Sequence, residues 1–179
     1  MDRQWTSGSM RYISPREGAG TDAWREEAEA QGGVGTQKLL EVTEVIPSDQ
    51  VLAALGLGKG ETAVVRRRVM YLDGHPVELT DSYYPAAAVR GTPLAEGLKI
   101  RGGAVQALAD LGFVACHVIE DIESRPPTDA ETSALELRPG DWVLTLFRTS
   151  LTTDRRPMEA AIMTVPARHH RLRYELGGV

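Results

Sequence analysis

The chain has 179 residues, of which 42% are hydrophobic and 25% are charged, and this composition suits one globular domain with a substantial core. The net charge of −5 argues against general affinity for a polyanion such as DNA, and the single Cys116 excludes an internal disulfide framework. Because there is neither a signal peptide nor an apolar run long enough to span a bilayer, we expect a cytoplasmic protein with no membrane contact.

We interpret residues 1–36 as a polar lead-in with one short helix over Asp22–Gln31, and residues 37–179 as the domain itself. Apolar patterns and capping residues predict the later elements: a strand over Lys38–Ile46, a helix from the cap Ser48 to Leu55, a helix over Ala104–Leu111, a strand over Val114–Glu123, a helix beginning at the capping box of Thr128, and strands over Trp142–Thr149, Met158–Val165 and His169–Leu176. We identify no internal repeat. Long strands mixed with short helices predict an α+β fold with a mainly antiparallel sheet and short helices packed around it.

The segment from Arg66 to Pro85 carries the strongest local signal. Two strand-like runs meet at Asp73-Gly74, which is typical of a tight hairpin. Alternation then places Arg66, Arg68 and Met70 on one face of the first strand. On the second strand, Glu78, Thr80 and Ser82 share a face. Two arginines, a carboxylate and hydroxyl groups would therefore converge as the lining of a site for a small polar or anionic ligand.

This hairpin resembles a known family. Arg66-Arg67-Arg68, Asp73-Gly74-His75-Pro76-Val77-Glu78 and Ser82-Tyr83-Tyr84-Pro85 are similar to the effector-binding (UTRA) domain of GntR-type bacterial transcription regulators. Landmarks in the same order cover roughly residues 38–177, among them Gly102-Gly103, Leu137-Arg138-Pro139-Gly140-Asp141 and Arg156-Pro157-Met158-Glu159. The resemblance implies a chorismate-lyase-like fold that pairs as a homodimer. It also implies a winged helix-turn-helix domain ahead of the effector domain, for which residues 1–36 are too few.

The arginines are the first candidates for ligand contact. Guanidinium matches a carboxylate or phosphate bidentately, so Arg66 and Arg68 would bind an anionic group, unless they make ordinary surface ion pairs. Arg67 points to the opposite face. Met70 lies close to a position where several sugar-phosphate-sensing relatives place an arginine, which puts a phosphosugar in doubt and favours a larger or more apolar ligand with a carboxylate. Glu78 and Ser82 share the arginines' face, although Glu78 could equally neutralise an arginine.

The resemblance adds three more ligand-contact candidates. Arg125 corresponds to a basic residue near the pocket mouth of relatives, and Glu159 corresponds to a ligand-contacting position. A structural ion pair between Arg148 and Glu159 is the competing interpretation. Tyr174 could contribute a phenol, although a buried core role is more common for a tyrosine.

We therefore expect a small-molecule sensor domain of a GntR-type regulator that lacks its own DNA-binding domain. It would form a homodimer, or a heterodimer with a full-length regulator, and would not bind nucleic acid by itself. The alternative is a stand-alone lyase, isomerase or cyclase on the same fold, with Glu78 or Glu159 as general acid or base. Neither the four histidines nor Cys116 has a metal-ligand spacing, and no cofactor motif occurs, so we expect no metal and no cofactor.

Overall fold

A six-stranded antiparallel sheet forms the centre of the protein. The computed structural model describes residues 5–7, 23–100 and 102–174. The strands lie in the order β2-β3-β4-β7-β6-β5, with bounds Gly35–Val45 (β2), Ala63–Leu72 (β3), His75–Pro85 (β4), His117–Arg125 (β5), Val143–Leu151 (β6) and Pro157–Pro166 (β7). This arrangement, with a few short helices around the sheet, confirms the predicted α+β fold.

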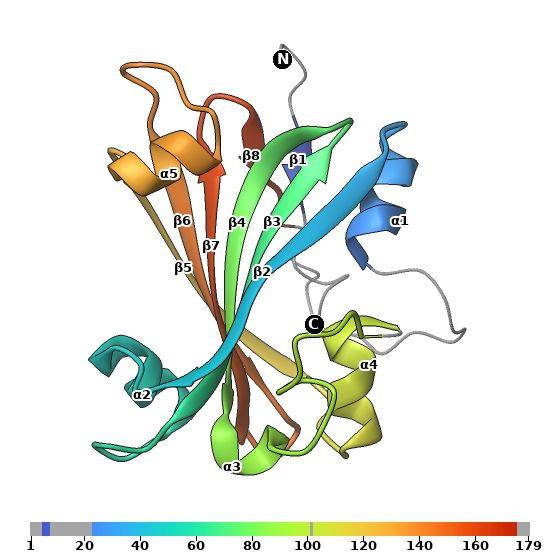
Figure 1. The fold of residues 1–179 in the computed structure, drawn as a ribbon, viewed down its shortest axis with the longest axis vertical. Helices are drawn as coiled ribbons and strands as arrows, with labels where there is room; N and C mark the ends of the chain where they lie inside the picture. Colours follow the sequence, from blue (N-terminus) through green and yellow to red (C-terminus); the bar gives the residue numbers. More distant parts are fainter. Residues whose placement is uncertain (1–4, 8–22, 101, 175–179) are drawn as a thin grey trace.

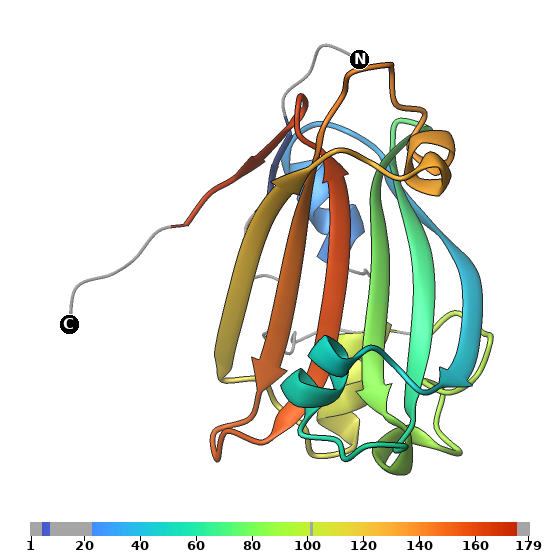
Figure 2. The ribbon, with the colours of Figure 1, turned by 90° about the vertical axis from the view of Figure 1, so that its left-hand side faces the viewer.

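The helices cover the two faces of the sheet differently. Figure 2 views the outer face, on which α2 (Asp49–Leu55) and α5 (Asp129–Ala134) lie in front of the strands. The inner face carries α1 (Ala23–Ala30) and α4 (Gly103–Asp110), and the short α3 (Ala86–Val89) follows β4 at one end of the sheet. Outside the main sheet, β1 (Trp5–Ser7) and β8 (His170–Leu172) form a parallel pair.

Two apolar clusters attach helices to opposite faces. On the outer face Val51 and Leu55 of α2 pack against Val65, with Tyr83, Phe147 and Ala160 in the same cluster. On the inner face Trp24 of α1 packs with Met70 and Leu72 of β3. These contacts follow from strand alternation, because successive residues of β3 face opposite sides of the sheet.

Local sequence signals place the turns and caps as expected. Asp73 and Gly74 both have positive φ, 50° and 82°, as a type I′ hairpin turn requires. Ser48 accepts a hydrogen bond from the backbone of α2, and Gly56 ends that helix in the left-handed conformation. Thr128 and Glu131 form a reciprocal capping box at the start of α5.

Two expected strands have different bounds, and one strand was not expected. β5 begins at His117, whereas the sequence predicts a strand from Val114. The strand predicted over His169–Leu176 covers His170–Leu172 among the described residues, residues 175 and 176 lying outside them, and it pairs with Trp5–Ser7, where the sequence predicts no strand. Isolated short strands of this kind depend on a partner from far along the chain, which local patterns do not reveal.

The two halves of the sheet repeat one another, which corrects our expectation that there is no internal repeat. Pro47-Ser48-Asp49 recurs as Pro127-Thr128-Asp129. The strand pairings repeat in the same way. The pair Glu44–Val64 of β2 and β3 corresponds to the pair Ser124–Leu144 of β5 and β6, and the pair Ala63–Pro85 of β3 and β4 corresponds to the pair Val143–Pro166 of β6 and β7. The counterparts are 80 or 81 positions apart. Asp81 and Ile162 are counterparts of each other in the two halves, and they also pair with each other between β4 and β7. A pseudo-twofold axis therefore passes through this pair.

The pseudo-symmetry has a direct consequence for polar residues. Arg68 on β3 corresponds to Arg148 on β6, and Glu78 on β4 corresponds to Glu159 on β7. Both arginine–glutamate sets face the inner side of the sheet. Few side chains are identical between the halves, so the repeat is inconspicuous in the sequence and evident in the strand register.

In the part of the chain that the structure describes, no helix is long and apolar enough to cross a bilayer.

Candidate functional site

Polar side chains cross the middle of the inner face. The register sets Arg68 opposite Thr80 and Ser82 opposite Ala161, which in turn lies opposite Arg148. We call this group the polar cluster; its members are Arg68 (β3), Glu78, Thr80, Ser82 and Tyr84 (β4), Glu120 (β5), Arg148 (β6) and Glu159 (β7). Thr80, Ser82, Tyr84, Arg148 and Glu159 are buried. Burial of this much polarity requires internal partners or a bound one.

The Arg68 guanidinium has an N–H group that no acceptor among the described residues uses. Its Nη2 donates to Ser82 Oγ at 2.8 Å. Its Nε is buried and has no hydrogen-bond partner among the described residues. A buried guanidinium N–H without an acceptor is costly, so this atom is the natural place for an acceptor on a ligand.

Glu78 lies opposite Met70 at one end of the cluster, within electrostatic reach of the Arg148 and Arg68 guanidinium groups. Its Oε1 accepts from Thr80 Oγ1 at 2.5 Å. Burial raises the pKa of the Glu78 carboxyl, against the lowering effects of the Thr80 hydroxyl and of the Arg148 and Arg68 guanidinium groups. A carboxyl in this setting can either accept a ligand hydrogen bond or, when protonated, donate one.

The other two carboxylates of the cluster hold neighbouring polar groups. Glu159 Oε1 accepts from the Tyr84 hydroxyl at 2.8 Å. Burial, followed by the charge of Glu159, raises the pKa of Tyr84, so this phenol stays protonated and donates. Glu120 Oε1 lies 3.8 Å from Arg148 Nη1, and both side chains are only 8% exposed. Arg148 therefore forms an ion pair with Glu120 on β5, whereas the sequence had offered Glu159 as its partner.

Arg66 has a different environment from Arg68. Its guanidinium donates to the carbonyls of Leu94, Glu96 and Leu98 at 3.0, 2.7 and 2.9 Å and to that of Pro93 at 3.3 Å. The side chain is 4% exposed. These bonds hold the loop that follows α3, so the donors that we had expected to meet a ligand are already used.

Three further candidates lie apart from the polar cluster. Met70 packs in the apolar cluster of Trp24 and Leu72. Arg125 makes two bonds to the Glu131 carboxylate, of 2.6 and 2.8 Å, beside the capping box of α5. Tyr174 is 46% exposed beyond the end of β8. Of the eight predicted ligand contacts, the cluster brings together Arg68, Glu78, Ser82 and Glu159.

The sequence analysis did not identify every member of the cluster. Tyr84 and Glu120 were missed, and Arg148 was considered only as a structural partner. The internal repeat could have revealed Arg148, because it is the counterpart of Arg68. Within the described residues, no group of three or more histidine, cysteine, aspartate or glutamate side chains is arranged to hold a metal ion.

Comparison with known proteins now identifies relatives. The UTRA domain family model matches residues 30–171. An uncharacterized HTH-type transcriptional regulator of Streptomyces coelicolor is 33% identical over 163 residues, which span 89% of this chain and 57% of that regulator. A crystal structure assigned to the GntR family of transcriptional regulators superposes with a TM-score of 0.83 at 25% identity, over 98% of this chain and 71% of that one. The effector domain of PhnF from Mycobacterium smegmatis has a TM-score of 0.76 at 19% identity, over 92% of this chain and 99% of that one, which shows the same fold.

Proposed function

Because this chain belongs to the UTRA domain family of GntR-type transcription regulators, we propose that it senses a small molecule, which binds at the polar cluster on the inner face of its sheet. The observation that carries the proposal is the buried Arg68 Nε, which lacks a hydrogen-bond partner in the described part of the chain. A ligand acceptor at that atom would remove the cost of the unmade bond, about 1–3 kcal/mol or more for a charged group.

The chemistry of the cluster favours a ligand with a carboxylate. Arg68 offers Nε, and the hydroxyl beside it, Ser82 Oγ, can donate to a second oxygen. The Nη1 and Nη2 donors of Arg66 are bonded to backbone carbonyls, and Met70 packs with Trp24 and Leu72 apart from the cluster. Because the Glu120 carboxylate lies 3.8 Å from the second guanidinium of the cluster, that of Arg148, the cluster suits a monoanion better than a phosphate dianion.

The carboxylates would select the rest of the ligand. Glu78 and Glu159 lie on neighbouring strands of the same face, and each already accepts one hydroxyl. Each retains acceptor capacity for a hydroxyl, amide or amine of the ligand. The resulting ligand would carry an anionic group at one end and hydrogen-bond donors at the other.

In this proposal ligand binding to the domain changes the activity of a transcription regulator. The chain spans 57% of the length of the curated relative that it matches, so any effect on transcription would involve more than the residues seen here. We infer a homodimer, as the family resemblance implies, with a heterodimer with a full-length regulator as the variant arrangement. Size measurement by multi-angle light scattering, with and without ligand, tests the assembly.

Retention of metabolites by the purified protein tests the function. The protein is incubated with a cell extract and desalted, and the retained compounds are identified by mass spectrometry. Arg68→Met should weaken binding of the retained compound about 10–150-fold, the equivalent of one charge-assisted hydrogen bond. Arg67→Met is the matched control, because Arg67 is on the outer face with Glu41 and Asp81. Equal losses in both variants would reject the polar cluster as the binding site.

One observation supports the enzyme alternative. Burial raises the pKa of Glu78, which lies near two arginines, and such a carboxyl can act as a general acid. The same incubation separates the two functions. A compound retained unchanged supports a sensor. A compound converted in amounts far above that of the protein, with conversion lost in Glu78→Gln, supports an enzyme.

A further inference from the structure

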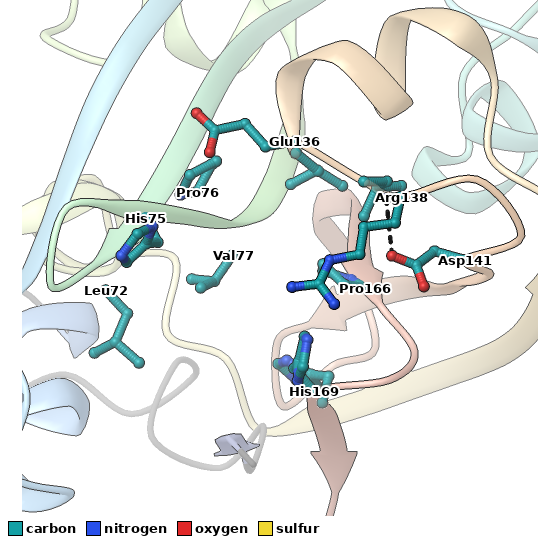
Figure 3. Close-up of a pocket in the computed structure, with 12 residues that line it drawn as sticks. Leu72, His75, Pro76, Val77, Glu136, Arg138, Asp141, Pro166 and His169 are labelled. Carbon is teal, nitrogen blue, oxygen red and sulfur yellow. Dashed lines mark hydrogen bonds between the residues drawn. The ribbon is translucent and has the colours of Figure 1, made fainter. Parts of the chain in front are cut away.

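A second candidate site lies at the end of the sheet near the β3–β4 hairpin, and its lining residue Val77 precedes Glu78 of the polar cluster. A cavity of about 210 Å³ opens there between the hairpin, the loop after α5 and the segment after β7 (Figure 3). Its frame is apolar, formed by Leu72, Pro76, Val77, Leu135, Leu137 and Pro166. Its polar lining consists of His75, Glu136, Arg138, Asp141, His169 and His170.

The pseudo-symmetry of the fold supplies an internal control for this cavity. A second cavity, of about 280 Å³, occupies the equivalent place at the opposite end of the sheet. The frames correspond residue by residue: Leu135 and Leu137 match Leu55 and Leu57, and Pro76, Val77 and Pro166 match Pro157, Met158 and Pro85. The fold therefore generates the apolar frame twice.

Four of the six polar lining residues have apolar or glycine counterparts, whereas His75 corresponds to Arg156, which lines the other cavity. His169 and His170 stand where the other cavity has Ala88 and Val89. Glu136 and Arg138 stand where the chain elsewhere has Gly56 and Gly58. The other cavity is completed by Leu108, by Phe113 and by Arg156, whose guanidinium lies over the Phe113 ring. Since the same frame forms with small or apolar residues at these positions, the fold does not require the polar groups.

Arg138 is the charged group that this cavity offers to a ligand. Its side chain extends toward the His169 and Val77 side of the cavity (Figure 3). Across the described ranges of the chain, its guanidinium makes no ion pair or hydrogen bond. The nearby Asp141 carboxylate is already engaged, because it accepts from the Arg138 backbone N–H at 2.9 Å and from Arg168 Nη2 at 2.7 Å.

Glu136 adds a second unusual feature at the same place. Its φ is 52°, in the left-handed region, whereas its counterpart Gly56 has a φ of 65° without a side chain to strain. A glutamate is unfavourable there compared with glycine. In Figure 3 its carboxylate lies on the Pro76 side, away from the Arg138 guanidinium. Strained non-glycine residues concentrate at sites of function.

We propose that this cavity is an accessory site for a small organic carboxylate with a compact apolar or aromatic body. The body would occupy the frame of leucines, valine and prolines, and the carboxylate would accept from Arg138. The volume of about 210 Å³ is below the range of about 300–1,000 Å³ usual for drug-sized ligands, so the ligand has the size of benzoate. A single guanidinium among apolar residues suits a monocarboxylate better than phosphate.

Titration of the ¹⁵N-labelled protein with sodium benzoate, followed by amide chemical shifts at constant ionic strength and pH, tests the proposal. Saturable shifts are expected for amides lining the cavity, including those of Val77, Leu137 and His169. Acetate, which lacks the apolar body, and inorganic phosphate should each bind at least tenfold more weakly. This result would separate a carboxylate site from a general anion site.

Three variants complete the test. Arg138→Gln should weaken benzoate binding at least tenfold. Arg90→Gln removes an exposed positive charge that pairs with Glu44 and does not line the cavity, and Arg68→Met alters only the polar cluster, so both should bind benzoate as the parent protein does. The proposal is overturned by unsaturable or absent shifts around the cavity, by unchanged binding in Arg138→Gln, or by loss of binding in Arg68→Met. The folded state of each variant is read from the same spectra.

Discussion

Replacement of Arg66 by methionine should destabilise the protein strongly, although the adjacent Arg68 tolerates the same change. Arg66 is 4% exposed, and its guanidinium donates to four backbone carbonyls between Pro93 and Leu98. Methionine fills most of the volume of the aliphatic stem but donates nothing. The variant therefore isolates the four hydrogen bonds.

The magnitude follows from the burial of the four acceptors. The bond to Leu94 is buried, and that carbonyl would remain unpaired at a cost of about 1–3 kcal/mol. The bonds to Pro93, Glu96 and Leu98 are only partly buried, so water can replace the guanidinium at about 0.5–1 kcal/mol each. The total is about 2.5–6 kcal/mol. For a protein of this size each kcal/mol lowers Tm by roughly 2–4 °C, so Tm should fall by about 5–24 °C.

Thermal and urea unfolding of three variants measure this effect. Arg68→Met should stay within about 1 kcal/mol of the parent, because it removes one hydrogen bond together with a buried donor that has no partner. Arg90→Met is the surface control, since its ion pair with Glu44 lies in water and its Tm should hardly change. Equal destabilisation by Arg66→Met and Arg68→Met would refute the assignment of a structural role to Arg66 and a ligand-binding role to Arg68.

Three further predictions concern pH and backbone conformation. The Arg125 guanidinium holds the pKa of Glu131 at about 2, below its ordinary 4.5, so the stabilisation is present above about pH 4.5 and is lost as the pH falls toward 2. In Glu131→Gln the urea midpoint of unfolding should change less with pH across that range than in the parent protein. An equal dependence on pH in both proteins would contradict the ion pair. Burial lowers the pKa of His170 from 6.5 to about 4, so the folded state loses stability as the pH falls between these values. His170→Gln should vary less than the parent there, and parallel profiles would reject this linkage. Gly74→Ala should cost about 1 kcal/mol in thermal unfolding, because φ is 82°; no loss would mean that the turn relaxes.

The pseudo-twofold arrangement explains why the polar cluster is central. Arg68 and Glu78 from one half and their counterparts Arg148 and Glu159 from the other half lie on the same face, on either side of the β4–β7 pairing of Asp81 with Ile162. Each half supplies the same two residue types, but their partners differ. Glu159 accepts from Tyr84, and Glu78 accepts from Thr80. The symmetric frame thus presents an asymmetric set of donors and acceptors, as recognition of one defined molecule requires.

Several features of the fold could be predicted because their causes are local. The Asp73-Gly74 turn, the Ser48 cap and the capping box of Thr128 depend on residues within four positions of one another. The shared face of Arg68, Glu78 and Ser82 follows from strand alternation once the hairpin is recognised. For the same reason the family resemblance, which is strongest in this hairpin, indicated the correct architecture.

The bonding partners of individual side chains often come from positions far away in the sequence. Arg66 and Arg68 are equivalent in the alternation, yet the loop that follows α3 supplies carbonyls to Arg66 alone, from positions 27 to 32 residues further along the chain. Arg125 was expected at a pocket mouth, but the nearby turn of α5 brings Glu131 within bonding distance. Glu120 joins Arg148 only because β5 pairs with β6.

The amino-acid sequence by itself thus determined the elements, the faces of the hairpin and the family, because short-range sterics, capping and alternation act over a few residues. The tertiary structure alone decided which charged groups are satisfied within the chain and which remain available to a ligand. The physical reason is that a buried guanidinium or carboxylate must find partners, and most of those partners come from strands and loops that only folding brings alongside.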